Sequence, residues 1–390
     1  MMFISQDIRY IGVNDHNIDL FEGQYKVPNG MAYNSYMFVD DRIAVMDTVD
    51  AAFTHQWLNN LSIALDGRKP DYLVIHHMEP DHSASISAFV EAYPEACVVS
   101  NAKAFTMMDN FYGEGVCKNR MVVANNDTLS LGRHTLSFVL APMVHWPEVM
   151  VSYDNADKVL FSADAFGKFG ANDIEEPWEA EARRYYFGIV AKYGPQVQSL
   201  IKAASAFDIS VICSLHGPVL KENISDYIQK YVTWSAYNPD SQGVFIAYTS
   251  VYGNTEKAAI LLAEELKQRG CEEVELCDLA RNDVYAAVAN AFYYSKVVFA
   301  TTTYNSTIFP TMKQFIDHLT ERGFQNRTVG LIENGSWAAM ATKVMKGMLE
   351  KCKGLSYLEQ EVTIKSALTD KNKAEIKMMA DEISRGVIIK

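Results

Sequence analysis

Short apolar runs separated by polar turns dominate the first 240 residues of the chain. Residues 35–39 and 43–47, for example, are apolar segments joined by Asp40-Asp41-Arg42, a turn signal between two strands. This pattern predicts an α/β domain with layers of helices and antiparallel or mixed sheet. Further strands are predicted at residues 72–75, 96–100, 121–123, 135–140, 149–153, 159–161 and 211–215, and helices at 51–65, 83–92, 174–208 and 226–234.

Beyond residue 240 the pattern becomes a regular alternation of one apolar strand and one helix. A polar run at residues 237–243, which contains Pro239 and Gly243, marks the change, so we place the domains at residues 1–240 and 241–390. Five strand–helix units predict a doubly wound parallel sheet, whose ligand lies at the carboxyl ends of the strands. The strands are expected at 244–248, 273–277, 296–300, 328–332 and 362–364, and the helices at 255–269, 284–291, 312–320, 338–349 and 373–384.

Composition and charge narrow the classes of function. The chain has 390 residues, which suits two domains, and 35 basic against 48 acidic residues leave a net charge of −13. There is no basic stripe to neutralise phosphates, so we expect no nucleic acid partner. The start lacks the features of a signal peptide, and no apolar run approaches the ~18–20 residues of a membrane span. Six scattered cysteines without a Cys-x-x-Cys pair suit a reducing compartment, so we expect a cytoplasmic protein with no membrane partner.

The apolar strand at residues 72–75 runs into a segment rich in metal-type ligands, His77-x-Glu79-x-Asp81-His82. This spacing lets one short segment serve two metal ions, with the first two ligands directed to one ion and the last two to the other. Clustered carboxylates and imidazoles cost stability unless a metal ion offsets that cost. The sequence therefore predicts a metal site at this turn.

Three residues that follow other predicted strands are candidates to complete the site, namely His145, Asp164 and His216. A carboxylate such as Asp164 can bridge two ions about 3.5–4 Å apart. A single histidine at a strand end is more often structural, so His145 and His216 are each weak candidates when taken alone. His76 is expected to point away from the cluster, because neighbouring side chains alternate across a strand.

A second chemical signal lies between the strand at 244–248 and the helix that follows it. Hydroxyls and backbone N–H groups at a helix start bind anions, and a glycine lets the backbone close round them. The loop is not a Walker loop, and it lacks the G-x-G-x-x-G pattern of dinucleotide sites. The alternative is a well-capped helix start without a ligand. The candidate phosphate-binding residues are Ser250, Tyr252, Gly253, Asn254 and Thr255.

Two further loops follow the third and fourth strands of this segment and offer polar groups beside an aromatic ring. Such loops suit a planar ring system that carries a phosphate tail. Tyr304 and Trp337 are candidates for stacking on the ring, with packing within the protein as the alternative. The candidate residues of these loops are Thr302, Thr303, Tyr304 and Asn305, and Asn334, Gly335, Ser336 and Trp337.

The metal turn resembles that of the metallo-β-lactamase superfamily, whose hydrolases usually carry His-x-His-x-Asp-His. Here Glu79 replaces the second histidine, which makes the ligand set richer in oxygen and better suited to iron. His-x-Glu-x-Asp-His is the pattern of the flavodiiron proteins, and His145-Trp146-Pro147-Glu148 also resembles theirs. The resemblance implies one iron held by His77, Glu79 and His145, another held by Asp81, His82 and His216, and Asp164 as the bridge.

The second half of the chain resembles flavodoxin, in which three loops in this order hold flavin mononucleotide (FMN). The two resemblances imply an N-terminal metallo-β-lactamase-like αββα sandwich and a C-terminal flavodoxin-like domain. They also imply reduction of dioxygen to water, of nitric oxide to nitrous oxide, or of both. A cofactor of two non-haem irons would do this chemistry, with FMN relaying electrons.

No Cys-x-x-Cys pair marks a fused rubredoxin module, so we expect an external electron donor such as rubredoxin or a flavin reductase. The family also implies a head-to-tail homodimer or a dimer of dimers. Two alternatives remain open at this point, a dizinc hydrolase with an attached flavodoxin-like domain and a flavin electron carrier without catalysis. Residues near the metals that could tune the choice of gas include Tyr25, Trp146, Tyr185 and Tyr186.

Overall fold

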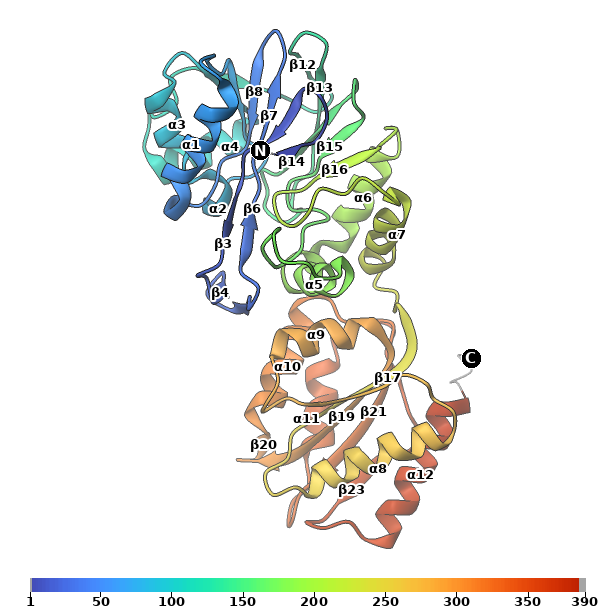
Figure 1. Cartoon of the computed structure of the whole chain (residues 1–390). Coiled ribbons are helices and arrows are strands. Elements are labelled where there is room, and N and C mark those ends of the chain that lie inside the picture. Colours follow the sequence, from blue (N-terminus) through green and yellow to red (C-terminus); the bar gives the residue numbers. More distant parts are fainter. Residues whose placement is uncertain (1, 386–390) are drawn as a thin grey trace. The chain divides into compact units, whose positions relative to one another are not determined.

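The structure is a computed structural model that describes residues 2–385 (Figure 1). The chain divides into two compact units, Met1–Val232 and the part that begins at Thr233. The connection between helix α7 (Ile224–Ser235) and strand β17 (Ser241–Tyr248) covers residues 236–240. Within the described residues, no helix has both the length and the apolar character needed to cross a membrane.

The first unit contains a mixed sheet of seven strands in the order β1-β2-β7-β8-β9-β10-β11. The pairs from β1 to β8 are antiparallel, and those from β8 to β11 are parallel. Strand β9 therefore lies in the parallel half of the sheet and delivers the metal turn at its carboxyl end. The strands are β1 (Met2–Phe3), β2 (Ile8–Tyr10), β7 (Tyr36–Val39), β8 (Ile43–Met46), β9 (Tyr72–Val74), β10 (Cys97–Ser100) and β11 (Arg120–Val122).

A second sheet of five strands faces the first one. Strands β12 to β15 are antiparallel, and β16 joins β15 in parallel. Phe38 and Met46 of the first sheet share one buried cluster with Phe138 and Phe161 of the second, so side chains of both sheets form a common core. The strands are β12 (Thr128–Ser130), β13 (Thr135–Leu140), β14 (Met150–Asp154), β15 (Val159–Phe161) and β16 (Val211–Cys213).

Helices cover the outer faces of the two sheets. Figure 1 shows α1, α3 and α4 together on one side of the sheets and α6 and α7 on the other. This arrangement confirms the predicted αββα sandwich. Two small hairpins, β3 with β6 (Val13–Asp15, Met31–Tyr33) and β4 with β5 (Leu20–Phe21, Tyr25–Lys26), complete the unit. The helices are α1 (Thr54–Leu65), α2 (Pro80–Ser83), α3 (Ile86–Ala92), α4 (Ala102–Tyr112), α5 (Trp178–Tyr185), α6 (Gly194–Ala204) and α7.

The segment predicted to be helical at residues 174–208 is helical from Trp178 to Ala204, but it is not one regular α-helix. The segment consists of α5, a π-helical stretch at Tyr186–Val190, a 3₁₀ turn at Ala191–Tyr193 and then α6. Pro177 immediately precedes α5, and Pro195 lies in the first turn of α6. A proline in the first turn of a helix is tolerated, because the N–H that it lacks would have no partner there. The residue before a proline disfavours the α conformation, so a regular α-helix does not run on into α6.

The strand at residues 96–100 was expected to open a strand–helix unit, but no bounds were predicted for its helix, which is α4. Its start carries a recognisable signal, because the Asn101 side chain accepts hydrogen bonds from the backbone N–H groups of Lys103 and Ala104. Asparagine is among the preferred residues at this capping position. Asn101 therefore marks where this helix begins.

The second unit is a parallel sheet in the order β18-β17-β19-β21-β22, with β23 also parallel to β21, which confirms the predicted doubly wound fold. The short strand β20 (Thr307–Ile308) pairs antiparallel with β19. The remaining strands are β18 (Val274–Asp278), β19 (Tyr294–Tyr304), β21 (Thr328–Asn334), β22 (Ser356–Tyr357) and β23 (Val362–Ile364). The helices are α8 (Asn254–Gln268), α9 (Val284–Tyr293), α10 (Pro310–Glu321), α11 (Ala341–Leu349) and α12 (Asp370–Arg385).

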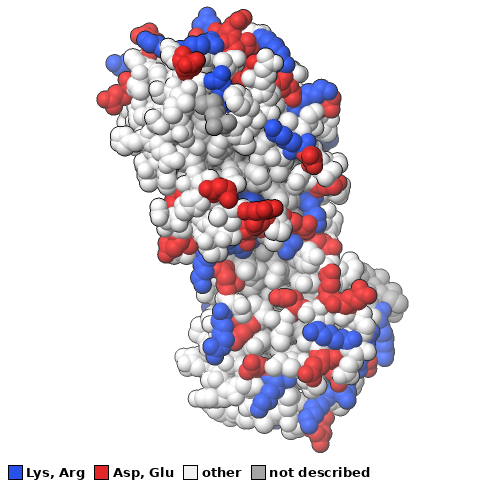
Figure 2. Space-filling view, viewed as in Figure 1, with Lys and Arg blue, Asp and Glu red and all other residues white. Residues whose placement is uncertain are grey.

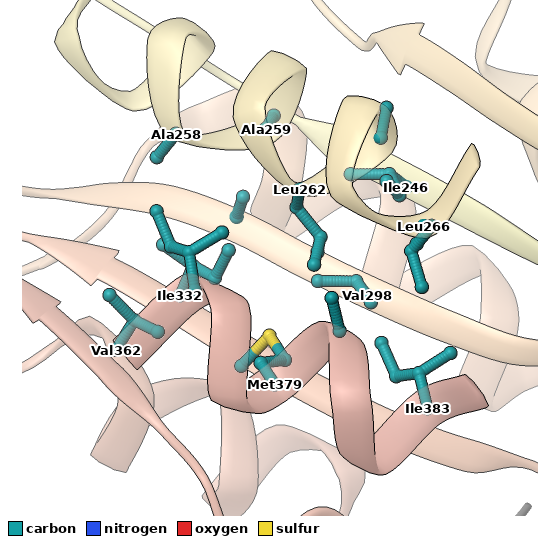
Figure 3. Packing of buried hydrophobic residues seen from close by; sticks show 14 of the residues in the cluster. Ile246, Ala258, Ala259, Leu262, Leu266, Val298, Ile332, Val362, Met379 and Ile383 are labelled. Carbon is teal, nitrogen blue, oxygen red and sulfur yellow. The ribbon is translucent and has the colours of Figure 1, made fainter. Parts of the chain in front are cut away.

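Buried apolar side chains hold helices α8 and α12 against one face of the sheet in this unit. Leu262 and Leu266 of α8 point onto the sheet beside Met379 of α12, and both helices meet Ile246 and Val298 (Figure 3). Helices α9, α10 and α11 lie on the opposite face of the sheet (Figure 1). The loops that follow β17, β19, β21 and β23 therefore share one edge of the sheet, where a ligand site is expected.

Candidate metal centre and flavin pocket

Four side chains form what we call the first donor group, His77, Glu79, His145 and Asp164. Glu79 Oε2 lies 3.2 Å from Nε2 of His77 and 3.2 Å from Nε2 of His145. Asp164 Oδ2 lies 3.0 Å from the same atom of His145 and 3.4 Å from that of His77. The four residues of this group lie in the turn after β9, the loop between β13 and β14, and the loop after β15.

Asp81, His82 and His216 form the second donor group. The Nε2 atoms of the two histidines lie 3.0 Å apart, and Asp81 Oδ2 lies 3.3 Å from each of them. The predicted helix start at Ser83 is too late, because α2 begins at Pro80, a residue that favours the first helical turn. Asp81 and His82 thus project from a short helix rather than from an open turn.

Asp164 faces both groups, one with each carboxylate oxygen. Oδ2 lies beside the imidazoles of the first group, and Oδ1 lies 3.3 Å from Nε2 of His82 and 3.9 Å from Nε2 of His216. Both carboxylate oxygens of Asp81 and Oδ1 of Asp164 are buried without a hydrogen-bond partner. Buried polar atoms are rarely left in this state, so the unpartnered atoms point to an ion that belongs between them.

The spacing of the donors also fits metal ions. Two ligands bound to one ion at about 2.1 Å lie roughly 3.0–3.4 Å apart at the usual angles. The distances between 3.0 and 3.4 Å within each group match that value. The residues present therefore fit two neighbouring ions with Asp164 between them.

Burial and charge set the protonation of the donors in the metal-free chain. Burial opposes a charge on Asp164, but the attraction of His77 and hydrogen bonds from two histidines hold the pKa of Asp164 well below its usual range. Burial lowers the pKa of His145, yet hydrogen bonds with Asp164 and Glu79 raise it to about 9. Burial lowers the pKa of His216 and raises that of Asp81 to about 7. The first group therefore carries protons that metal binding must displace.

Two hydrogen bonds from outside the donor groups orient the histidines. Nδ1 of His77 lies 2.8 Å from Oε1 of the buried Glu148, which also accepts from the backbone N–H of Met78 at 2.9 Å. Nδ1 of His216 lies 2.8 Å from the backbone oxygen of Ala32. Each bond leaves Nε2 free to face the site. Sequence reasoning did not assign these roles, because the partners are distant in the chain.

His76 lies apart from both donor groups. Its Nδ1 is 2.5 Å from Asp47 Oδ2, and its Nε2 is 2.8 Å from Ser152 Oγ. Asp47 also accepts from the backbone N–H of His76. His76, just after β9, therefore forms hydrogen bonds with the residue after β8 and with a residue of β14, and its role is structural.

Aromatic rings surround the donors and limit the access of water. The rings of Phe21, Tyr33 and Tyr185 lie 5.4, 6.1 and 5.5 Å from that of His216. Trp146 packs edge-on against His77 at 5.2 Å. Of the other residues that sequence reasoning considered for tuning, Tyr25 donates its hydroxyl to the Gly188 oxygen, and Tyr186 stacks edge-on against Phe187 and Tyr231.

In the second unit a pocket of about 520 Å³ opens at the carboxyl edge of the sheet. All the sequence-predicted flavin residues except Gly253 line it, and Gly253 has a φ of 82° just before α8 begins. A left-handed backbone of this kind favours glycine. The pocket is also lined by five residues that sequence reasoning missed, Val251, Ser306, Ala338, Met340 and Ser366.

The polar groups of this pocket fit a phosphorylated ring system. Oγ1 of Thr255, in the first turn of α8, and Oγ1 of Thr302 are shielded from solvent and have no hydrogen-bond partner. Ser366 belongs to a fourth loop, where its N–H donates to Asn334 Oδ1 at 3.1 Å. Since this loop also follows a strand at the same sheet edge, the rule for parallel sheets would have found it.

The two units match two different family descriptions. Residues 31–217 match "ODP family beta lactamase", and residues 245–379 match "Flavodoxin domain". Fold and sites thus define a protein that joins a lactamase-like metal domain to a flavodoxin-like domain, and a flavodoxin domain implies FMN.

Two curated relatives match this chain across both units and over 96% and 75% of their own lengths. Rubredoxin-oxygen oxidoreductase of Megalodesulfovibrio gigas is 30% identical over 97% of this chain and 96% of its own. Anaerobic nitric oxide reductase flavorubredoxin of Salmonella arizonae is 28% identical over 90% of this chain and 75% of its own. The solved structure of rubredoxin oxygen:oxidoreductase from Desulfovibrio gigas superposes with a TM-score of 0.92, at 29% identity and over 98% of both chains. The chain belongs to the flavodiiron proteins, a family of oxidoreductases.

Proposed function

We propose that this chain reduces dioxygen to water, nitric oxide to nitrous oxide, or both, at a non-haem diiron centre that receives electrons through FMN. The observation that carries the proposal is Asp164, whose two oxygens face two separate donor groups. The names of the relatives, an oxygen oxidoreductase and a nitric oxide reductase, support both gases as substrates.

We assign the irons to the two donor groups, with His77, Glu79 and His145 on one ion, Asp81, His82 and His216 on the other, and Asp164 shared. Each ion would then have two imidazoles and two carboxylates, a hard donor set that suits iron better than zinc. When bound, the irons would supply a binding site for the gas and a store of two electrons, and FMN would supply two more.

The chain's own residues prepare the site for this reaction. Glu148 and the Ala32 oxygen hold His77 and His216 in the tautomer that presents Nε2 to the ions. Asp164 sets the spacing of the two groups. The rings of Phe21 and Tyr185 shield the reacting side from bulk water, which strengthens the electrostatic interactions inside.

In the second unit we assign the phosphate of FMN to the loop of Ser250, Tyr252, Gly253, Asn254 and Thr255 at the start of α8. Backbone N–H groups and the positive end of the helix favour an anion there. The isoalloxazine would lie against the loops of Thr302–Asn305 and Asn334–Trp337. The boundary at residues 240 and 241 separates these two functional parts.

For partners, we propose an external donor such as rubredoxin or a flavin reductase, and a head-to-tail homodimer or a dimer of dimers. The name of the Megalodesulfovibrio relative supports a rubredoxin-type donor. Around the flavin pocket, the side chains of Trp337 and Tyr252 are 95% and 91% exposed. Large exposed aromatic residues at one site mark an interaction surface, which a second copy of the chain would cover.

We also propose a cytoplasmic location without nucleic acid or membrane partners. All six cysteines are free, which suits a reducing compartment. On the face that Figure 2 shows, basic side chains are interspersed with acidic ones rather than gathered into a stripe.

Metal analysis followed by anaerobic gas consumption tests the proposed function. Purified protein is expected to hold about two iron ions per chain and to consume nitric oxide, oxygen or both when a reduced donor is supplied. Zinc in place of iron, with no gas consumed, would instead support the dizinc hydrolase. Gas consumption that survives the double substitution Asp81→Asn and His82→Asn would support an electron carrier that does no chemistry at this site.

A further inference from the structure

A cavity of about 320 Å³ lies in the first unit between the second sheet and helices α6 and α7. Val151 and Leu160 contribute from β14 and β15, Val197 from α6, and Ile228 from α7. The remaining lining residues are mostly Val, Leu, Ile, Ala and Phe, and the polar ones are Ser162, Ser205, Asp208, Ser225 and Tyr231.

The inner wall of the cavity is formed by the immediate chain neighbours of two proposed iron ligands. Val144 precedes His145, and Ala165 follows Asp164. Val144, Ala165 and Phe166 are all buried. The loops that carry the two ligands therefore present their donors on one side and an apolar surface to the cavity on the other.

The polar groups in the lining are already engaged. Ser162 Oγ donates to the Ala165 oxygen at 2.7 Å, and the hydroxyl of Tyr231 accepts from the backbone N–H of Phe166 at 2.7 Å. Asp208 forms an ion pair with Lys158. None of the lining residues, all of which the structure describes, has a buried side-chain polar atom that lacks a partner. A polar ligand would thus gain little here.

The chemistry of the lining selects the kind of occupant. Closed apolar cavities of about 150 Å³ take up xenon or benzene, so this larger apolar pocket, which opens to solvent, has room for small apolar molecules. Among the described residues, no Lys or Arg lines the cavity, so the carboxylate of a fatty acid would lack a counter-ion in the lining. A small neutral apolar molecule fits the observations best.

We propose that this cavity takes up dioxygen or nitric oxide from solvent and supplies it to the donor groups through the wall of Val144 and Ala165. The identity of the gas rests on the proposed function, whereas the capacity to hold an apolar gas does not. Both gases partition from water into apolar surroundings, which concentrates them next to the site.

Xenon is the probe for the cavity. Crystals of the iron- and flavin-loaded protein under xenon pressure are expected to show xenon in contact with Val151, Leu160 and Val197. The absence of xenon from this cavity would overturn the proposal. If xenon binds but the protein consumes neither gas, the proposed function fails while the gas-binding cavity stands.

A matched pair of substitutions tests the supply of gas. Ala204→Phe fills the cavity from the end of α6, and Ala203→Phe adds the same ring at the exposed neighbouring position. Ala204→Phe is expected to displace xenon and to raise KM for the gas by a factor of about three to ten, with kcat at saturating gas unchanged, whereas Ala203→Phe changes neither. If Ala204→Phe does not fold, Ile228→Phe fills the cavity from α7 instead. Loss of xenon with an unchanged KM would refute the supply role.

Discussion

Glu148 offers a sharp test of how the outer contacts of the metal site control metal binding. It is 1% exposed and accepts hydrogen bonds from Nδ1 of His77 and from the backbone N–H of Met78. Burial alone would raise its pKa, but the hydrogen bond with His77 lowers it below the usual value, so the carboxylate is charged at neutral pH. We predict that Glu148→Ala weakens iron binding without removing any ligand.

The expected magnitude follows from the bond that is lost. A hydrogen bond to a charged group contributes about 1.5–3 kcal/mol. At about 1.4 kcal/mol per tenfold change, the loss of the bond to His77 lowers the affinity of the first donor group by roughly 10–100-fold. Loss of a partner that orients a metal-bound histidine has effects of the same size in other metal sites.

The conservative substitution Glu148→Gln separates charge from orientation. Its amide oxygen can still accept from Nδ1 of His77, so most of the orientation survives while the charge is lost. Its effect is therefore expected to lie between those of the unaltered protein and Glu148→Ala. Glu91→Ala, at an exposed position of α3, serves as the control and is expected to bind iron normally.

Iron affinity is measured by competition with a chelator, beside the Tm of the metal-free proteins. We expect Glu148→Ala to lose more iron affinity than any fall in its Tm accounts for. Equal affinities for Glu148→Ala and Glu91→Ala would refute it, because the bond to His77 would then contribute nothing to metal binding.

Three further predictions address the rest of the chain. Thr255→Ala, which removes a buried and unpartnered hydroxyl, should weaken FMN binding about tenfold or more in a fluorescence titration, and an unchanged Kd would exclude Thr255 from the phosphate site. Burial lowers the pKa of His134, but hydrogen bonds with Asp154 and Asp7 raise it above the usual 6.5. Protonated His134 therefore stabilises the fold at pH values below 6.5, and this stabilisation is lost as the pH rises through the raised pKa. His134→Asn should therefore lower Tm more at about pH 6 than at about pH 9, and equal losses would contradict this sign. Trp337→Ser should shift the chain towards the monomer in light scattering if a second copy covers that ring, whereas an unchanged mass would argue against its place in the dimer interface.

Much of the fold could be predicted from local sequence patterns, because the formation of a strand or helix depends largely on residues that are neighbours in the chain. Apolar runs located β7 and β8, and the regular alternation after residue 240 predicted the parallel sheet of the second unit. The helical segment predicted at residues 174–208 is present from Trp178 to Ala204, but its composition suits a helix throughout and did not reveal the π-helical and 3₁₀ stretches inside it. Pro195 lies in the first turn of α6, where the helix type changes.

The chemistry of the metal site was visible in the sequence where its ligands are adjacent. His77, Glu79, Asp81 and His82 lie within six positions, and the replacement of a histidine by Glu79 already indicated iron. His145 and His216 were weak candidates on their own, since nothing local distinguishes them from structural histidines. Only the folded chain brings their Nε2 atoms to within about 3 Å of the other donors.

Other features were decided by the tertiary structure alone. The hydrogen bond between Glu148 and His77 joins residues 71 positions apart, and the two oxygens of Asp164 face different groups because three loops converge on them. The apolar cavity behind Val144 likewise exists only because α6 and α7 pack against the second sheet. Residue type and local spacing determined which atoms could bind metal and where strands and helices form. Their distances, protonation and surroundings depend on contacts between distant segments, which form only when the chain has folded.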